Sequence, residues 1–403
     1  MQLFEGEEPE FDELSLNFTI DELRKALIGG YGEEATKLQW GTPDAEMVRH
    51  LHHNVYQFSV AKNFTQMRTL TSALIDENGH TRSLSDFMNE AAKIDKKFNV
   101  DYLRAEYDTA VNSAEMASHW VRFKQMGDPM LRYVTVGDER VRASHAAMNG
   151  IQRPMSDPIW DKIYPPNGWN CRCTVVTTTG AATPGKQIRM PWDVPPMFQT
   201  NLAKTGLLWP KGHPYFKALP APTTKRMVEQ ADDRFLAFAT DYAVELARKE
   251  DRNEDAAFHE AAFRTAKLII GQEIGINAEL KIPKDKQYGT GKIRLTSKSI
   301  KEAFKWTGHT SQIDNKYALL HVLRHPNIIQ FTASKPVGAG KDANSEADAK
   351  NIEKKKREGI KRFNYYNFDY EGAPYTLHLK VHKKGYELIY AVYSGYDRYP
   401  VKE

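Results

Sequence analysis

The sequence of 403 residues contains only two cysteines, and a single residue separates Cys171 from Cys173. Such a pair cannot build a disulfide framework, so we expect a protein of a reducing environment rather than a secreted one. No stretch approaches 18 consecutive apolar residues, so no transmembrane helix is predicted. The first residues, Met1–Glu13, are acidic and interrupted by Pro9, and we therefore expect no secretory signal there.

An excess of charge of one sign is also lacking, because the formal net charge is only +4. This average conceals two differently charged parts. Residues 281–403 contain 24 Lys and Arg against 13 Asp and Glu, a net charge of +11. The rest of the chain contains the other 32 of the 56 basic and 39 of the 52 acidic side chains, a net charge of −7. A basic part of this kind is what a domain that contacts nucleic acid requires, since phosphate contacts supply most non-specific affinity. A lysine-rich solvated surface explains the same composition equally well.

At roughly 100–200 residues per domain, the length predicts two to four domains. Changes of composition and periodicity divide the chain into five segments. These are an acidic leader (1–41), a helical and motif-containing domain (42–180), a Pro/Gly-rich tether (181–222), a helical connector (223–281) and a basic α+β domain (282–403). The predicted fold class is multidomain α+β, with a helical N-terminal arm or bundle, a small Pro/Trp-rich core around the Cys-x-Cys pair, and C-terminal helices followed by an antiparallel meander.

Caps and breakers place the predicted helices of the front half. The leader contains one short helix that we expect to end at Gly29-Gly30. Thr42-Pro43-Asp44 opens a long helix that reaches about Ile75, because threonine is a good capping residue and proline suits the first turn. Two further helices are predicted over residues 83–97 and 101–126.

A dense motif lies in the middle of the chain, between about Tyr133 and Val176. It places two thiols, one imidazole and several carboxylates on a strand–helix–turn scaffold that proline and glycine make rigid. Its distinctive residues are Asp138, Arg140, Arg142, His145, Gly150, Trp160, Pro165, Pro166, Gly168, Cys171 and Cys173.

The thiols and the imidazole of this motif are residue types that bind zinc. His145, Cys171 and Cys173 would supply three ligands, and a carboxylate such as that of Asp138 or Asp157 would be needed as the fourth. The alternative is that both cysteines are small buried packing groups and that the imidazole makes an ordinary hydrogen bond. Nucleophilic catalysis by a cysteine is a weaker hypothesis, because no second His/Asn pairing accompanies the thiols.

The same residues, in the same order, resemble the Mu F-like head morphogenesis family, the minor head proteins of tailed phages and prophages. With the helices before it, the resemblance covers about Thr42–Val176, roughly a third of the chain. It implies a structural protein of the virion, present in a few copies inside the procapsid near the portal and assembled in the host cytoplasm. The implied partners are the portal protein, the major capsid protein or both, with a role in DNA packaging or ejection. The family's Cys/His set implies zinc at the three ligands named above.

The basic C-terminal part combines predicted helices with three predicted strands. Helices are expected to open at Ser297 and to span residues 311–324, and a charged helix or loop is expected over 353–358. The predicted strands are Arg362–Tyr370, Tyr375–His382 and Tyr386–Tyr393, joined by tight turns into an antiparallel meander. Alternation along the middle strand places Tyr375, Leu377, Leu379 and Val381 on one face and Thr376, His378, Lys380 and His382 on the other.

Helices followed by a meander in a basic domain resemble the barnase–EndoU–colicin–RelE-like nuclease fold, whose domains occur behind head morphogenesis modules of phages. The resemblance implies a metal-independent ribonuclease with a general base, a general acid and a cationic group. His378, His382 and Lys380 are the predicted catalytic residues, and solvent-facing histidines are the alternative. Such an enzyme would be a toxin delivered with the phage DNA and would have an immunity protein as partner. A third hypothesis is a domain that only binds DNA or RNA.

Two other patterns carry less weight. His50 and His53 share one helix face, where an exposed surface explains them better than a metal site does. The run Gly338-Ala339-Gly340-Lys341 lacks the frame of a phosphate loop, so we expect no nucleotide site there. Further histidines of the C-terminal helical part are His309, His321 and His325. The leading prediction is a phage minor head protein, and the ribonuclease carrier is its rival.

Overall fold

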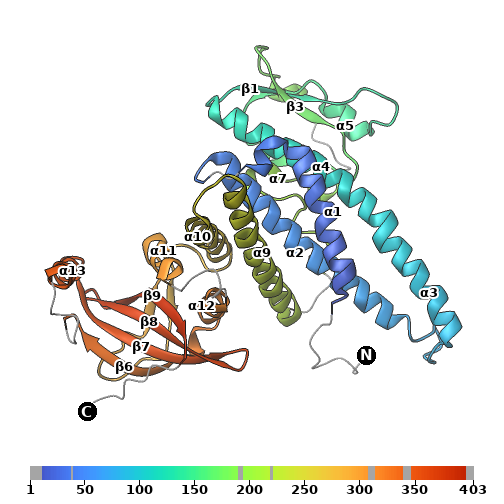
Figure 1. The fold of residues 1–403 in the computed structure, drawn as a ribbon. Coiled ribbons are helices and arrows are strands. Elements are labelled where there is room, and N and C mark those ends of the chain that lie inside the picture. The colour runs from blue at the N-terminus through green and yellow to red at the C-terminus, as the bar shows by residue number, and fades with distance from the viewer. Residues whose placement is uncertain are drawn as a thin grey trace. The chain divides into compact units, whose positions relative to one another are not determined.

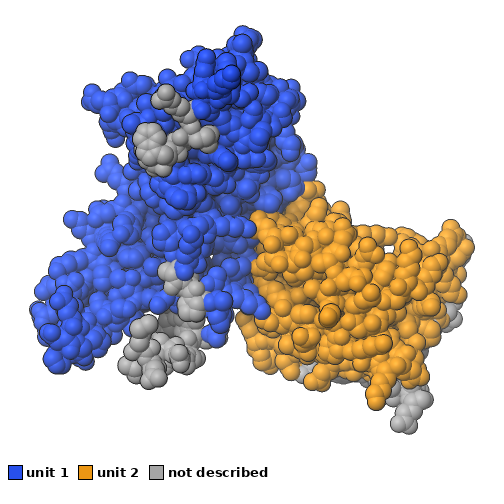
Figure 2. Space-filling view, turned by 180° about the vertical axis from the view of Figure 1, so that it is seen from behind, with its two compact units in different colours: residues 1–235 blue, residues 236–403 orange. Residues whose placement is uncertain are grey.

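The computed structural model describes residues 11–37, 40–188, 194–217, 221–306, 314–338 and 346–395. The chain divides into two compact units, residues 1–235 and 236–403 (Figures 1 and 2), and each is described by itself. The predicted multidomain α+β class is confirmed, because helices dominate the first unit and the second contains a mainly antiparallel sheet. Within the described ranges, no helix is long and apolar enough to cross a membrane.

Helices build most of unit 1. They are α1 (Glu13–Tyr31), α2 (Pro43–Ser72), α3 (Leu84–Lys96), α4 (Leu103–Gln125), α5 (Ala143–Met148), α6 (Trp160–Ile163), α7 (Leu202–Thr205) and α8 (Pro214–Lys217), and α9 (Ala221–Lys249) begins in this unit. The predicted cap of α2 is confirmed, since Thr42 Oγ1 accepts a hydrogen bond from the amide of Ala45 at 3.1 Å. Ser83 caps α3 in the same way, by accepting from the amide of Asp86 at 3.1 Å. Each cap satisfies an amide that has no partner inside its helix.

The predicted end of the leader helix at Gly29-Gly30 is wrong. α1 continues to Tyr31, and Gly32, with a φ of 93°, is its C-cap. The two glycines were misinterpreted because one of them serves packing: a Cβ at Gly30 would lie 2.1 Å from the carbonyl oxygen of Val111 in α4. Only glycine lets the two helix backbones approach this closely.

The segment predicted as a tether, residues 181–222, contributes buried side chains to unit 1. Phe198 and Trp209 are fully buried, and the ring of Trp209 stacks on Phe58 of α2 with centroids 4.0 Å apart. The side chain of Asn54, also on α2, accepts a hydrogen bond from the amide of Trp209 at 3.0 Å. The aromatic residues therefore anchor this segment to α2 instead of leaving it extended. Trp192 lies outside the described residues.

Unit 2 contains a six-stranded sheet. Its strands are β4 (Glu279–Lys281), β5 (Lys292–Arg294), β6 (Gln330–Pro336), β7 (Ile360–Tyr370), β8 (Ala373–His382) and β9 (Tyr386–Ser394), in the order β4-β5-β9-β8-β7-β6. The helices of this unit are α10 (Glu254–Glu273), α11 (Ser297–Trp306), α12 (Asp314–Arg324) and α13 (Glu346–Arg357). The predicted antiparallel meander corresponds to β7, β8 and β9 and is confirmed.

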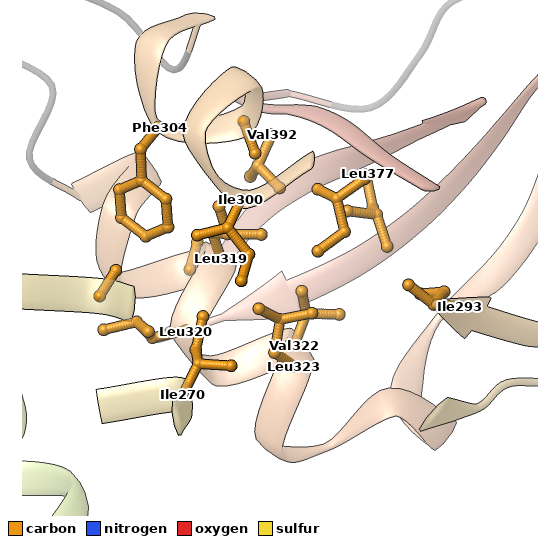
Figure 3. Close-up of a cluster of buried hydrophobic side chains, with 14 of the residues drawn as sticks. Ile270, Ile293, Ile300, Phe304, Leu319, Leu320, Val322, Leu323, Leu377 and Val392 are labelled. Atoms are coloured by element: carbon orange, nitrogen blue, oxygen red, sulfur yellow. The ribbon is translucent and has the colours of Figure 1, made fainter. Parts of the chain in front are cut away.

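The core of unit 2 lies between one face of the sheet and α10, α11 and α12 (Figure 3). Ile270, Phe304 and Leu320 from the helices belong to the same buried cluster as Leu377 and Val392 from the sheet. The predicted core face of β8 is therefore confirmed for Leu377, and the same cluster includes Tyr375 and Leu379. On the opposite face Thr376 and Lys380 are buried as well, so that face is not the solvated one that simple alternation suggested.

Candidate metal centre

A small three-stranded sheet in unit 1 supports the Cys-x-Cys motif. Its strands are β1 (Met130–Val134), β2 (Gln152–Pro154) and β3 (Thr174–Thr177), antiparallel throughout and ordered β2-β1-β3. The two cysteines directly precede β3, which Tyr133 of β1 fixes by pairing with Val175. α5, which follows β1 in sequence, carries His145. The sheet thereby brings together residues that lie 26 positions apart in the chain.

The predicted ligands come together in the structure. Nδ1 of His145 lies 3.4 Å from Sγ of Cys173 and 3.8 Å from Sγ of Cys171. In a tetrahedral zinc site with bonds of about 2.0 Å to nitrogen and about 2.3 Å to sulfur, such ligands lie about 3.5 Å apart. Each of the three side chains is only 3% exposed, so a bound ion would be shielded from bulk water. The donor types and their spacing both fit zinc.

The two thiols differ in their affinity for protons. A hydrogen bond with Cys173 lowers the pKa of Cys171, and a hydrogen bond with His145 lowers it further. The hydrogen bond with Cys171 raises the pKa of Cys173, and burial adds to this effect. Cys171 is thus the favoured thiolate, and Cys173 keeps its proton. Zinc would displace that proton, because the metal binds cysteine as thiolate.

Buried polar side chains surround the ligands. The hydroxyl of Tyr133 donates a hydrogen bond to Oδ1 of Asn167 at 2.9 Å, and both side chains are buried. Burial raises the pKa of Tyr133, so its hydroxyl keeps its proton and remains a donor. The backbone amide of Asn167 in turn hydrogen-bonds Cys171. Such neighbours orient metal ligands and are part of a working metal site.

Arginines of the motif connect the loop before α5 with the loop that carries the cysteines. Both Nη atoms of Arg172 contact the carboxylate of Asp138, at 2.7 and 2.8 Å. Nη2 of Arg142 donates to the carbonyl oxygen of Trp169 at 2.8 Å. The guanidinium of Arg142 also lies 3.4 Å from the position of a Cβ at Gly168, so a larger residue there would press on it. These contacts hold the two loops together over the cluster.

The carboxylates suggested as a fourth ligand lie elsewhere. Asp138 is engaged by Arg172, and Asp157 accepts a hydrogen bond from the amide of Ile159 at 2.9 Å. In the part of the chain that the structure describes, no fourth His, Cys, Asp or Glu joins the cluster. A cavity of about 20 Å³ adjoins the cluster instead, which is room for one water-sized ligand.

The remaining motif residues build the scaffold. Trp160 is fully buried and donates from Nε1 to the carbonyl oxygen of Pro154 at 3.0 Å. Gly150 has a φ of 84°, which suits glycine, and its amide donates to the carbonyl oxygen of Tyr133. The Pro165-Pro166 peptide bond is cis.

The residues predicted to be catalytic lie on β8 but in different surroundings. The ring of His378 stacks on Tyr365 with centroids 4.4 Å apart, and burial lowers the pKa of this histidine to about 3. Among the described residues its Nε2 has no hydrogen-bond partner. Lys380 forms an ion pair with Glu302 at 2.7 Å. His382 lies four residues beyond His378, or about 13 Å along the strand, and its ring stacks on Tyr386 with centroids 4.7 Å apart. A catalytic role of these residues stays a prediction.

The other histidines singled out in the sequence have structural partners. His53 is buried and hydrogen-bonds the buried carboxylate of Asp232, so the expectation of an exposed helix face is wrong for it. The rings of His321 and His325 lie 4.7 Å apart. His309, Gly340 and Lys341 lie outside the described residues.

Sequence reasoning missed the buried charges of unit 1. Lys62 of α2 and Glu106 of α4 form an ion pair with almost no exposure, and the hydroxyl of Tyr215 donates to the same carboxylate at 2.9 Å. Burial lowers the pKa of Lys62 and raises that of Glu106. The available signal was a lysine directly after the apolar run Val60-Ala61, but its partner lies 44 positions away.

Comparison with known proteins identifies the region around this cluster. Residues 35–176 match the family described as Phage Mu protein F like protein, so the resemblance predicted from the motif is confirmed over that range, which we call the Mu F-like region. The chain is 38% identical to the Mu-like prophage FluMu F protein of Haemophilus influenzae over 88 residues, which are 22% of this chain and 21% of that protein. It is 28% identical over 112 residues to "Putative capsid assembly protein F" of Escherichia phage Mu, which covers 27% of this chain and 23% of that protein.

The chain therefore spans between a fifth and a quarter of the length of these curated relatives. No solved structure matches it. The nuclease-like nature of the C-terminal part stays a prediction.

Proposed function

We propose that this chain is a structural protein of phage head assembly and that its Mu F-like region is a zinc-stabilised module that binds other head proteins. The observation that carries the proposal is that one region contains both the family match and the His145–Cys171–Cys173 cluster. The proposed partners are the portal protein and the major capsid protein. The proposed location is the virion, with assembly in the host cytoplasm, and a role in DNA packaging or ejection belongs to the same proposal.

The helical arm of the Mu F-like region supports a protein-binding role. α3 is amphipathic in sequence, yet none of its side chains is buried within this chain. Leu84 is 77% exposed and Met88 is 59% exposed, and both lie on α3. Apolar side chains grouped on a projecting element are typical of surfaces that another protein covers.

The test uses the phage or prophage that carries the gene. Deletion should abolish normal heads in electron micrographs of induced cultures, and the wild-type gene supplied in trans should restore them. The Cys171→Ser, Cys173→Ser double variant should fail to restore them, whereas Lys124→Ala, at an exposed position of α4, should restore them fully. Normal DNA-filled heads after deletion would refute the proposed function.

A second function, nucleic-acid binding, is proposed for unit 2 because of its lysine–aromatic face. Nζ of Lys355 lies 4.8 Å from the ring centroid of Phe363, and Nζ of Lys335 lies 5.1 Å from that of Tyr365. Lysines over aromatic rings combine positive charge with stacking surfaces, as proteins that bind single-stranded nucleic acid do. The ribonuclease hypothesis is the alternative use of this face.

Fluorescence anisotropy of the full chain with a labelled RNA and a DNA of the same sequence tests this second function. Binding should weaken as salt rises, and Lys355→Glu should weaken it more than Lys361→Glu, which changes an exposed lysine of β7. The same RNA incubated in EDTA separates the alternatives, because only a metal-independent ribonuclease would shorten it. Absence of salt-dependent binding to either probe would refute the second function.

A further inference from the structure

We propose that the fourth coordination position of the His145–Cys171–Cys173 site takes a carboxylate supplied from outside this chain. The inference rests on the zinc site proposed above and assigns its missing ligand. In the described ranges the cluster contains three ligands, whereas structural zinc is nearly always bound by four. The cavity of about 20 Å³ lies against all three, so the open position faces a space that one ligand atom, such as a carboxylate oxygen, can enter.

The lining of that cavity selects an anion. Besides the three ligands, it includes the arginines Arg140, Arg142 and Arg172. Zinc bound by two thiolates and one imidazole has no net charge, so a fourth, anionic ligand leaves one negative charge. Guanidinium groups stabilise such a charge and hydrogen-bond both oxygens of a carboxylate. A cationic or neutral ligand would lack this attraction between opposite charges.

The aspartates suggested as a fourth ligand are not available for this position, and Glu139 lies outside the ligand cluster. Arg172 holds Asp138 through two hydrogen bonds, and the amide of Ile159 engages Asp157. All three arginines are exposed, but Arg140 differs from the other two because its guanidinium makes no hydrogen bond or ion pair among the described residues, whereas those of Arg142 and Arg172 do. Its guanidinium is therefore free to meet an incoming anion without breaking the contacts that hold the loops.

Cobalt(II) loaded into the full-length chain provides the measurement. Cobalt bound by two thiolates gives visible and near-ultraviolet bands that change when a ligand is exchanged. The loaded protein is titrated with sodium acetate and, separately, with the peptide amide N-acetyl-Gly-Glu-Gly. Sodium perchlorate, whose anion coordinates metals only weakly, is the control for screening at matched ionic strength.

Acetate should change the cobalt bands in a saturable way. Arg140→Gln should weaken the acetate affinity about twofold to fivefold, the effect of one nearby surface charge. Arg132→Gln, at an exposed position of β1 outside the cavity lining, should leave it unchanged. Tighter binding of the peptide than of acetate would identify a protein side chain as the source, and equal affinity would identify a free carboxylate.

Two results would overturn the inference. Cobalt bands that neither acetate nor the peptide alters would mean that the site is closed, while the zinc site itself would stand. A protein that binds no cobalt through its thiolates would overturn the inference together with the proposed zinc site.

Discussion

The two adjacent glycines of α1 provide a sharp test of the packing in unit 1. A Cβ at Gly30 would lie 2.1 Å from the carbonyl oxygen of Val111 and 2.9 Å from its carbonyl carbon, whereas a Cβ at Gly29 would meet nothing within 4 Å. Both glycines are inside the same helix. Gly29→Ala therefore removes only the conformational cost of glycine, and we expect it to stabilise unit 1 by about 0.5–1 kcal/mol.

Gly30→Ala should have the opposite effect. The new methyl group collides with backbone, which cannot rotate away as a side chain can, so α1 must move by about 1 Å relative to α4. Overpacking of this kind costs about 1–3 kcal/mol, and the gain in helix propensity offsets at most about 1 kcal/mol of it. We expect the two variants to differ by about 2 kcal/mol, or about 1 M in the urea midpoint.

Tryptophan fluorescence is the appropriate signal for this comparison, because six of the seven tryptophans lie before residue 236. Urea unfolding of the full chain and of both variants gives the midpoints. If Gly30→Ala raised the midpoint as much as Gly29→Ala does, the close approach of α1 to α4 would be refuted. That result would instead agree with a helix that ends at the glycine pair.

Three further predictions concern buried polar groups. Lys62→Met should destabilise unit 1 by about 3–5 kcal/mol in urea unfolding, because it leaves the buried Glu106 carboxylate unpaired. Adding Glu106→Gln should recover most of this loss; a double variant whose loss is the sum of the two single losses would contradict the prediction. Burial lowers the pKa of His213 to about 4, so the unfolded chain takes up a proton at a higher pH than the folded chain does. The free energy of unfolding should therefore fall as the pH drops from about 6.5 to about 4. A His213→Gln variant whose free energy of unfolding falls as steeply with pH would contradict this assignment. His378→Phe should change the thermal midpoint of unit 2 little, since it keeps the stacking on Tyr365 and removes an imidazole nitrogen that lacks a partner among the described residues; if RNA cleavage is found, this variant should abolish it.

Local sequence patterns predicted those helices and strands that depend on residues close together in the chain. Thr42 was recognised as a cap because a capping hydrogen bond spans only three residues. Alternation predicted the strands of the meander, since its strands are long and joined by short turns. β4 and β5, at three residues each, are too short for alternation to be visible, and their pairing depends on distant segments.

Features that depend on distant partners could not be predicted in this way. Glycine is a residue type that commonly ends helices, and only the position of Val111 in α4 explains why Gly30 lies within α1. His53 lies on a helix face that looks polar, but Asp232, 179 positions later, makes it a buried residue. The ligand cluster was predictable in its members, because Cys and His are rare and close in the motif, but the arginine-lined cavity beside it was not.

The zinc content of the purified full-length chain tests the central claim most directly. Expressed with zinc in the medium and dialysed against metal-free buffer, the wild-type chain should retain about one zinc per molecule, as expected for a buried three-residue site. The Cys171→Ser, Cys173→Ser double variant should retain none, while His80→Ala, which changes an exposed histidine of the same region, should retain as much as wild type. A wild-type chain without zinc, or a double variant that keeps it, would contradict the proposed metal centre.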